Sequence, residues 1–305
     1  MQQNQPSRTA EATAFQRATE HRRPARQRIV DDPFAQHFLR PGLRAAVAAY
    51  GSSFVLKGVD DLFGLTPFVV TRHRYIDDRL GAALRAGVEQ VVVLGAGYDS
   101  RAFRFAEQLG ARPVFEVDHP ATQGRKERVL AALGKRIEVP HVDVRRVSVD
   151  FQRQSFEKRL AKAGFDSARS TFFIWEGVSM YLTRNAVKAT LATLAHIAPA
   201  GSELVFDAWF LVDEPDLRAT AYRLSANLLH VLGEPVTFSL HPEDAEAFLA
   251  RQGFALIEIA RAHDLERRYA RRPRRHVHPA CYLVHAAIGD GKNPPCPPSA
   301  SSTES

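Results

Sequence analysis

The stretch that decides the fold is "VVVLGAGYDSRAFR", residues 91–104, in which β-branched residues lead into a glycine-rich turn. Gly95 and Gly97 let the backbone turn tightly and approach a ligand without a Cβ atom in the way. Asp99 and Ser100 follow the turn and are typical of a helix start. A strand, a glycine-rich turn and a helix in this order are typical of a Rossmann-like nucleotide site.

Two features of this turn disfavour a dinucleotide. The dinucleotide fingerprint has a third glycine three residues after the second, but position 100 is Ser100. Asp99 would also place a carboxylate at the helix N-terminus, where a pyrophosphate normally binds. We therefore expect a ligand without phosphate, and an NAD-dependent oxidoreductase is the weaker alternative.

Short apolar runs alternate with helical segments on both sides of the turn. This alternation predicts parallel strands joined by helical crossovers, and strands that are apolar throughout predict a sheet covered on both faces. Two late apolar segments predict a closing antiparallel pair. We thus expect an α/β fold with a seven-stranded, mostly parallel sheet, formed by "QVVVLG", "PVFEVD", "IEVPHVD", "TFFIWEG", "SELVFDAW", "FALIEIARA" and "ACYLVHAAIG".

The rest of the chain divides by composition and periodicity into one domain with two tails. Residues 8–88 read as a helical cap, and residues 89–288 read as the Rossmann-like core with a helical lid near residues 212–233. Residues 1–7 and 289–305 are rich in Pro, Ser, Asn and Gly and lack apolar spacing, so we expect both ends to be disordered.

Acidic residues follow several of the predicted strands. Asp118 ends the second strand, Asp143 and Val144 end the predicted third strand, and Glu176 follows the fourth. Because the carboxyl ends of parallel strands share one edge, Asp118 could accept ribose hydroxyls there and Asp143 could accept from an adenine amino group. An acidic edge suits a cationic adenosyl ligand without phosphate, and S-adenosylmethionine is such a ligand.

Four motifs in this order resemble the leucine carboxyl methyltransferase superfamily, especially its bacterial O-methyltransferase branch: "VVVLGAGYDSRAFR", "FEVDHP", "HVDVRR" and "WEGVSMYL". The resemblance implies a class I methyltransferase fold, S-adenosylmethionine as the cofactor, and an N-terminal segment that covers the cofactor. It implies cofactor contacts for Gly95 and Gly97 at the methionine part, Asp118 at the ribose, Asp143 and Val144 at the adenine, and Glu176 at the methionine side.

The resemblance also implies two further roles. An arginine shortly before the first strand would hold the methionine carboxylate, and the sequence leaves Arg72 and Arg74 open for it. Tyr181 would face the methyl acceptor. We expect the acceptor to be a carboxylate of a small molecule, because a carboxylate is already ionised at neutral pH. A hydroxyl of a polyketide-type metabolite is the alternative acceptor.

The net charge of +7 raises the question of nucleic-acid binding. The densest basic segment is "ERRYARRPRRHVH", residues 266–278, which lies between two predicted strands. No recognition-helix, zinc-finger or RNA-binding motif accompanies it. We therefore expect a solvated loop and a small-molecule partner rather than a nucleic acid, and the oligomeric state stays open.

Cysteine and histidine spacing argues against disulfides and metals. The chain has two cysteines, Cys281 and Cys296, which makes a disulfide framework implausible and the reducing cytoplasm the expected compartment. His276, His278 and His285 lie close to Cys281 in sequence, but their spacing matches no paired-ligand pattern, so we predict no metal site. No apolar run is long enough to cross a bilayer.

Overall fold

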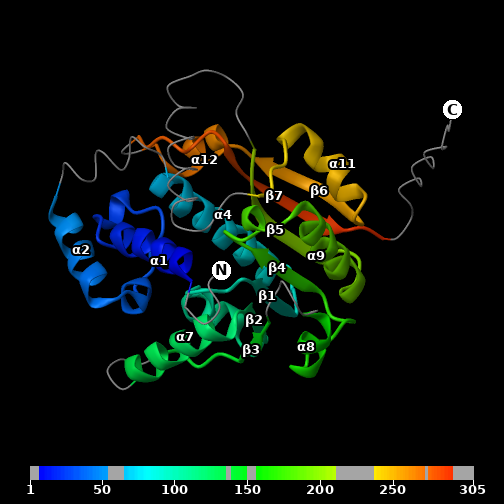
Figure 1. Ribbon diagram of the computed structural model, residues 1–305, viewed down its shortest axis with the longest axis horizontal. Helices are drawn as coiled ribbons and strands as arrows, with labels where there is room; N and C mark the ends of the chain where they lie inside the picture. The colour runs from blue at the N-terminus through cyan, green and yellow to red at the C-terminus, as the bar shows by residue number, and fades with distance from the viewer. Residues whose placement is uncertain are drawn as a thin grey trace.

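One seven-stranded sheet forms the centre of the computed structural model, which describes residues 7–53, 65–134, 139–149, 156–210, 237–271 and 274–290. The strand order is β3-β2-β1-β4-β5-β7-β6 (Figure 1). The strands are β1 Gln90–Leu94, β2 Val114–Asp118, β3 Val144–Ser148, β4 Thr171–Trp175, β5 Glu203–Trp209, β6 Phe254–Ala260 and β7 Cys281–Ile288. All pairs from β3 to β5 are parallel, whereas β7 is antiparallel to β5 and β6. The predicted α/β fold with a mostly parallel sheet and a closing antiparallel pair is confirmed.

Helices precede the sheet and connect its strands. The cap before β1 contains α1 Arg8–His21, η1 Ala25–Gln27, η2 Ala35–Phe38, α2 Pro41–Ser52 and α4 Leu65–Arg85. The remaining helices are α5 Arg101–Arg104, α6 Ala106–Leu109, α7 Pro120–Leu133, α8 Glu157–Lys162, η3 Ser179–Tyr181, α9 Arg184–Ile197, η4 Pro242–Asp244, α11 Ala245–Ala250 and α12 Ala262–Tyr269. In Figure 1, α1 and α2 lie on the same side of the molecule as α7, and α4 runs beside the sheet near the centre.

The two faces of the sheet belong to separate apolar clusters. In β1, Val92 and Leu94 pack into one cluster, which also contains side chains of α9 and α11. Val91 and Val93 point the other way into a second cluster with side chains of α4 and α12. Successive side chains of a strand alternate between faces, so a strand that is buried on both faces is mostly apolar at successive positions. This explains the uninterrupted apolar runs in the sequence.

The predicted position of the end of the third strand is wrong. The strand begins at Val144, which pairs with the first residue of β2, whereas Ser148 pairs with Asp118 at the carboxyl end. Asp143 and Val144 therefore lie at the amino edge of the sheet, so the prediction that they flank the adenine is wrong. Pro140 lacks the N–H that a strand ladder requires, and β3 is an edge strand that tolerates charged residues in its middle.

The ends of the folded domain extend slightly beyond their predicted limits. Ser7 was expected to be disordered but caps α1, where its hydroxyl accepts from the Ala10 N–H at 3.1 Å. Gly289 donates its N–H to the Gly253 carbonyl at 2.9 Å. The predicted lid near residues 212–233 lies outside the described residues. Among the described helices, none is long and apolar enough to cross a membrane.

The basic segment is not the solvated loop that its composition suggested. Its first residues belong to α12, where Arg267 donates to Asp264 at 2.7 Å and Arg268 donates to Glu258. Arg275 is buried and bonds to Glu20 of α1 with both terminal nitrogens, at 2.8 and 3.0 Å. Part of the positive charge of this segment is therefore paired with carboxylates of the protein itself.

The Arg275 and Glu20 pair ties the N-terminal cap to the segment before β7. Replacing Glu20 by alanine should lower the free energy of unfolding by about 3–5 kcal/mol, because the buried guanidinium would lose its counter-charge. Urea denaturation followed by circular dichroism measures this change. Glu246→Ala, at an exposed position of α11, should change the free energy by less than about 0.5 kcal/mol. Similar losses in both variants would contradict the tie.

Candidate active site

The glycine-rich turn after β1 leaves no room for side chains. Gly95 and Gly97 have φ angles of +66° and +47°, which favour glycine. A Cβ atom on Gly95 would lie 2.3 Å from Cγ2 of Val178, and one on Gly97 would lie 3.0 Å from the Cβ of Ala10 in α1. The turn is therefore enclosed by the residues after β4 on one side and by the N-terminal helix on the other.

Asp118 lies beside this turn, as its position at the end of β2 predicted. Its carboxylate accepts the N–H of Gly97 and, at 2.5 Å, the N–H of His119. Burial raises the pKa of Asp118 above its usual value, although these two hydrogen bonds oppose the shift. A carboxylate that accepts two donors at the mouth of a glycine turn has the geometry to accept a pair of hydroxyls.

The structure separates the two arginines that the sequence left open. Arg72 is buried at the carboxyl edge, where its Nε donates to Glu176 and its Nη1 donates to Asp207, both at 2.9 Å. Arg74 is half-exposed and donates to Asp78 at 2.8 Å. Residues two apart in a helix do not share a face, so α4 can direct one of these two side chains to the sheet edge. That side chain is Arg72.

Glu176 is surrounded by positive charge. Besides Arg72, Nη2 of Arg101 lies 2.8 Å and Nδ1 of His73 lies 3.1 Å from its Oε2. Burial by itself would raise the pKa of this carboxyl, but Arg101 and the other neighbours hold the pKa of Glu176 well below its usual value. Glu176 is therefore ionised at neutral pH in spite of its burial.

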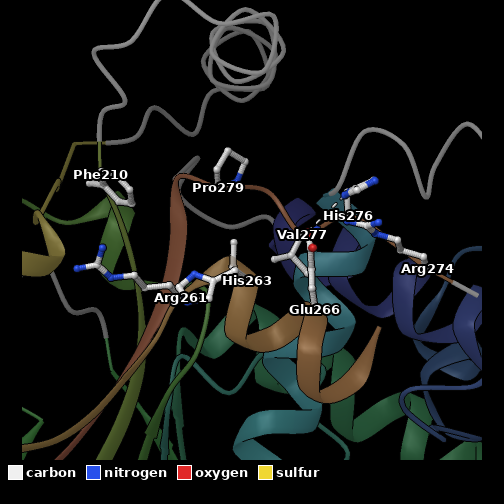
Figure 2. A pocket seen from close by; sticks show the side chains of 9 residues that line it. Phe210, Arg261, His263, Glu266, Arg274, His276, Val277 and Pro279 are labelled. Atoms are coloured by element: carbon white, nitrogen blue, oxygen red, sulfur yellow. Dashed lines mark hydrogen bonds and ion pairs between the residues drawn. The ribbon is translucent and has the colours of Figure 1, made fainter. Parts of the chain in front are cut away.

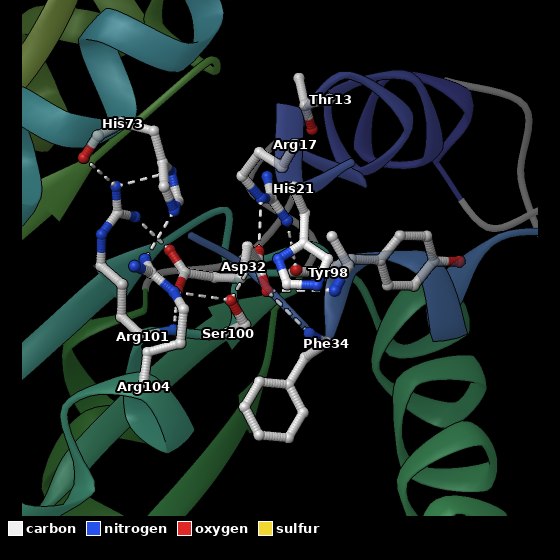
Figure 3. Close-up of polar contacts among 12 residues, drawn as sticks. Thr13, Arg17, His21, Asp32, Phe34, His73, Tyr98, Ser100, Arg101 and Arg104 are labelled. Atoms are coloured by element: carbon white, nitrogen blue, oxygen red, sulfur yellow. Dashed lines mark hydrogen bonds and ion pairs between the residues drawn. The ribbon is translucent and has the colours of Figure 1, made fainter. Parts of the chain in front are cut away.

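His73 lies between two arginines and a carboxylate. Its Nε2 lies 2.7 Å from Nη2 of Arg104, and its Nδ1 lies 2.8 Å from Nη2 of Arg101 (Figure 3). The same Nδ1 lies 3.1 Å from Oε2 of Glu176. Burial and the charge of Arg101 lower the pKa of His73. Asp77 completes this group by accepting from Nε of Arg101 and Nη1 of Arg104, both at 2.7 Å.

A second group of polar contacts joins the turn to the cap (Figure 3). Asp32 accepts from Nε of Arg17 at 2.9 Å and from the hydroxyl of Ser100 at 2.8 Å. Arg17 also donates to the carbonyl of Tyr98 at 2.7 Å. Burial raises the pKa of Asp32, but Arg17 and other neighbours outweigh it and bring the pKa to about 2. Ser100 thus stands at the third-glycine position because its hydroxyl anchors the cap.

Asp207 lies among the candidate site residues, although the sequence analysis did not predict it. Its Oδ1 accepts the N–H of Gly177 at 2.6 Å, and its Oδ2 accepts from Arg72. Gly177 has a φ of +70°, and a Cβ atom there would lie 3.4 Å from the Arg72 guanidinium. The signal was present as a lone acidic residue in the apolar run "LVFDAW" of β5, where an unpaired charge would be costly.

Tyr181 is the last residue of η3, the short helix that follows β4. It is half-buried and packs against the cluster that contains Met180, Trp209 and Val277. The acidic residue that follows β3 in the sequence is Asp150, which lies outside the described residues.

Among the described residues, no group of three His, Cys, Asp or Glu side chains could hold a metal ion.

The assembled edge combines three chemical functions. Asp118 accepts hydrogen bonds beside the glycine turn, Glu176 presents a buried negative charge, and Arg72 presents a buried guanidinium between Glu176 and Asp207. A ligand with vicinal hydroxyls, a cationic group and a carboxylate matches these functions.

Comparisons with known proteins give the chain its family. Residues 10–195 match the family described as leucine carboxyl methyltransferase. A Mycolicibacterium smegmatis protein, named as an S-adenosyl-L-methionine-dependent methyltransferase, is 35% identical over 209 residues, which cover 64% of each chain. A Saccharopolyspora erythraea protein named in the same way is 36% identical over 200 residues, which cover 65% of this chain and 66% of that protein. The match thus spans less than two thirds of the length of these relatives.

A solved structure supports the fold over most of the chain. The crystal structure of a DUF574 family protein from Streptomyces avermitilis aligns with a TM-score of 0.58 and 14% identity, covering 89% of this chain and 96% of that one. At this identity the likeness concerns the fold alone. The family match, by contrast, covers more than half of the sequence, and on this basis the chain belongs to the leucine carboxyl methyltransferase family.

Proposed function

We propose that the protein is an S-adenosylmethionine-dependent O-methyltransferase that methylates a carboxylate of a small molecule. The observation that carries this proposal is the meeting of Asp118, the glycine turn and Arg72 at one sheet edge in a member of this family. The names of the relatives from Mycolicibacterium smegmatis and Saccharopolyspora erythraea support the cofactor and the reaction type.

Different residues at this sheet edge would contact different parts of the cofactor. Asp118 would accept the two ribose hydroxyls, and the turn formed by Gly95 and Gly97 would contact the methionine part without a Cβ in the way. Arg72 would bind the methionine carboxylate, and the ionised Glu176 would balance the methionine ammonium group. When bound, the cofactor supplies a methyl group that is already activated by its sulfonium.

The protein contributes positioning and the exclusion of water. Helix α1 packs against Gly97 and would shield the reacting atoms, and Tyr181 would donate a hydrogen bond to the acceptor. A carboxylate needs no base, whereas a hydroxyl acceptor would need one. His73 is unsuited to this task because both of its ring nitrogens are engaged by Glu176 and Arg104.

Asp118→Asn should weaken S-adenosylhomocysteine binding by about 2 kcal/mol, roughly thirtyfold in Kd, because charge-assisted hydrogen bonds to the ribose are lost. Isothermal titration calorimetry measures the change. The matched control is Asp143→Asn, which lies at the opposite edge of the sheet and should leave the Kd unchanged. Equal effects of the two substitutions would remove Asp118 from the site.

Arg72→Gln should weaken S-adenosylmethionine roughly tenfold or more but leave 5′-methylthioadenosine binding unchanged, because the latter ligand has no carboxylate. Arg74→Gln should change neither affinity, since Arg74 pairs with Asp78 on the surface of α4. Calorimetry with both ligands separates a lost contact from general damage. An equal loss for the two ligands would assign Arg72 a purely structural role.

The methylation rate should be nearly flat between about pH 6 and 8, since a carboxylate acceptor has a pKa of about 4. The shifts in the buried network favour a flat profile, because the pKa of His73 is lowered from its usual value and the pKa of Glu176 lies well below its usual value. Labelled S-adenosylmethionine and extract-derived acceptors provide the assay, and the labelled product should be an alkali-labile ester. A rate that rises steeply through pH 7, with an alkali-stable ether product, would identify a hydroxyl acceptor instead.

A further inference from the structure

A cavity of about 300 Å³ opens at the carboxyl edge of the sheet on the far side of β5 from the glycine turn. It lies between the end of β5 at Phe210, the end of β6 at Arg261, helix α12 and the segment before β7 (Figure 2). Nothing in the cofactor contacts described above uses it. Its position at the carboxyl edge places it on the same side of the sheet as the cofactor residues.

The walls of this cavity differ in chemistry. Phe210 and Val277 supply apolar surface, whereas Arg274 and His276 supply nitrogen donors. In Figure 2, Phe210 and Arg274 lie on opposite sides of the cavity, and Glu266 lies below Val277. A ligand with an apolar body and a polar end could contact both walls at once.

Among the described residues that line the cavity, Arg274 is the cation left available by the surrounding charges. Glu266 accepts the N–H of Val277 at 2.8 Å and lies 3.6 Å from Nδ1 of His276, so its charge is engaged. Arg261 donates to Glu243 at 2.6 Å. The guanidinium of Arg274 has no hydrogen bond or ion pair with any residue in the part of the chain that the structure describes. Its planar donors match the two oxygens of a carboxylate.

The cavity is separated from the cofactor residues by a short aromatic path. Trp209 packs edge-on against Phe68 at 6.1 Å and stacks on His278 at 6.0 Å, and Phe68 in turn lies under the Arg72 guanidinium. Glu176 follows β4, and β7 is the second strand along from β4 in the sheet. A group bound at Arg274, which precedes β7, would therefore lie across β5 from Glu176.

We propose that this cavity binds an anionic end group, a carboxylate or a similar oxyanion, carried on the aromatic or hydrocarbon body of the acceptor. Arg274 holds the anion, and Phe210 and Val277 contact the apolar body. The acceptor is thus an acid that carries a second oxyanion apart from its methylated oxygen. The site itself rests on the cavity, and its assignment to the acceptor rests on the proposed function.

The test uses 2-naphthoate, with 2-naphthamide as its neutral isostere and 2-naphthalenesulfonate as a second oxyanion. Calorimetry with the full chain should show both anions binding roughly tenfold more tightly than the amide. Arg274→Gln should abolish this preference. Arg251→Gln removes the same charge from an exposed position at the end of α11 and should preserve it. A preference for 2-naphthoate over the sulfonate would assign the site to carboxylates.

Two results would overturn the inference: equal affinities of the wild-type protein for the anions and the amide, or a preference that survives Arg274→Gln. Circular dichroism of both variants shows that folding is retained. S-adenosylhomocysteine binding, measured on the same samples, separates this inference from the proposed function. If the cofactor product binds without an Arg274-dependent anion preference, the cavity inference alone fails. In the reverse case the proposed function fails together with the assignment of the anion to the acceptor, and the anion site itself stands.

Discussion

A buried carboxylate, that of Glu176, sets the constraint on which the rest of the site depends. Taking a charge out of water costs several kcal/mol unless partners surround it. Here the partners are Arg72 and His73 from α4 and Arg101 from α5, so two helices converge on the residue that follows β4. The two arginines must in turn be balanced, and Asp207 balances Arg72 from β5. The site is therefore a closed set of charges rather than separate contacts.

The same balancing of charge reaches the N-terminal cap. Arg104 bridges His73 and Asp77, and its Nε donates to the hydroxyl of Ser100, which also bonds to Asp32. Asp32 is the counter-charge of Arg17 in α1. A substitution in the cap should therefore alter the charges at the sheet edge. Each linked group would leave a buried charge unpaired if it lost its partner. The cap belongs to the site electrostatically as well as by its packing on Gly97.

The sequence predicted the features that have a local signal. A β-branched run before Gly95 and an acidic residue at the end of β2 identify the turn and Asp118 without knowledge of the rest of the fold. The choice between Arg72 and Arg74 depends on the rotation of α4 against the sheet, which is set by packing far away in sequence. Asp207 was missed because its partners, Gly177 and Arg72, come from β4 and α4. Register in an edge strand is weakly marked, which is why Asp143 was misplaced.

The arginines in the middle of β3, which interrupt its apolar pattern, also affect how the protein associates with other molecules. β3 is an edge of the sheet, and an unpaired edge offers its N–H and C=O groups to any other strand. Arg145 and Arg146 place two long cationic side chains in the middle of this edge, where Arg145 pairs with Asp143. A second molecule that approached edge to edge would have to take these paired charges out of water, which disfavours growth of the sheet by aggregation.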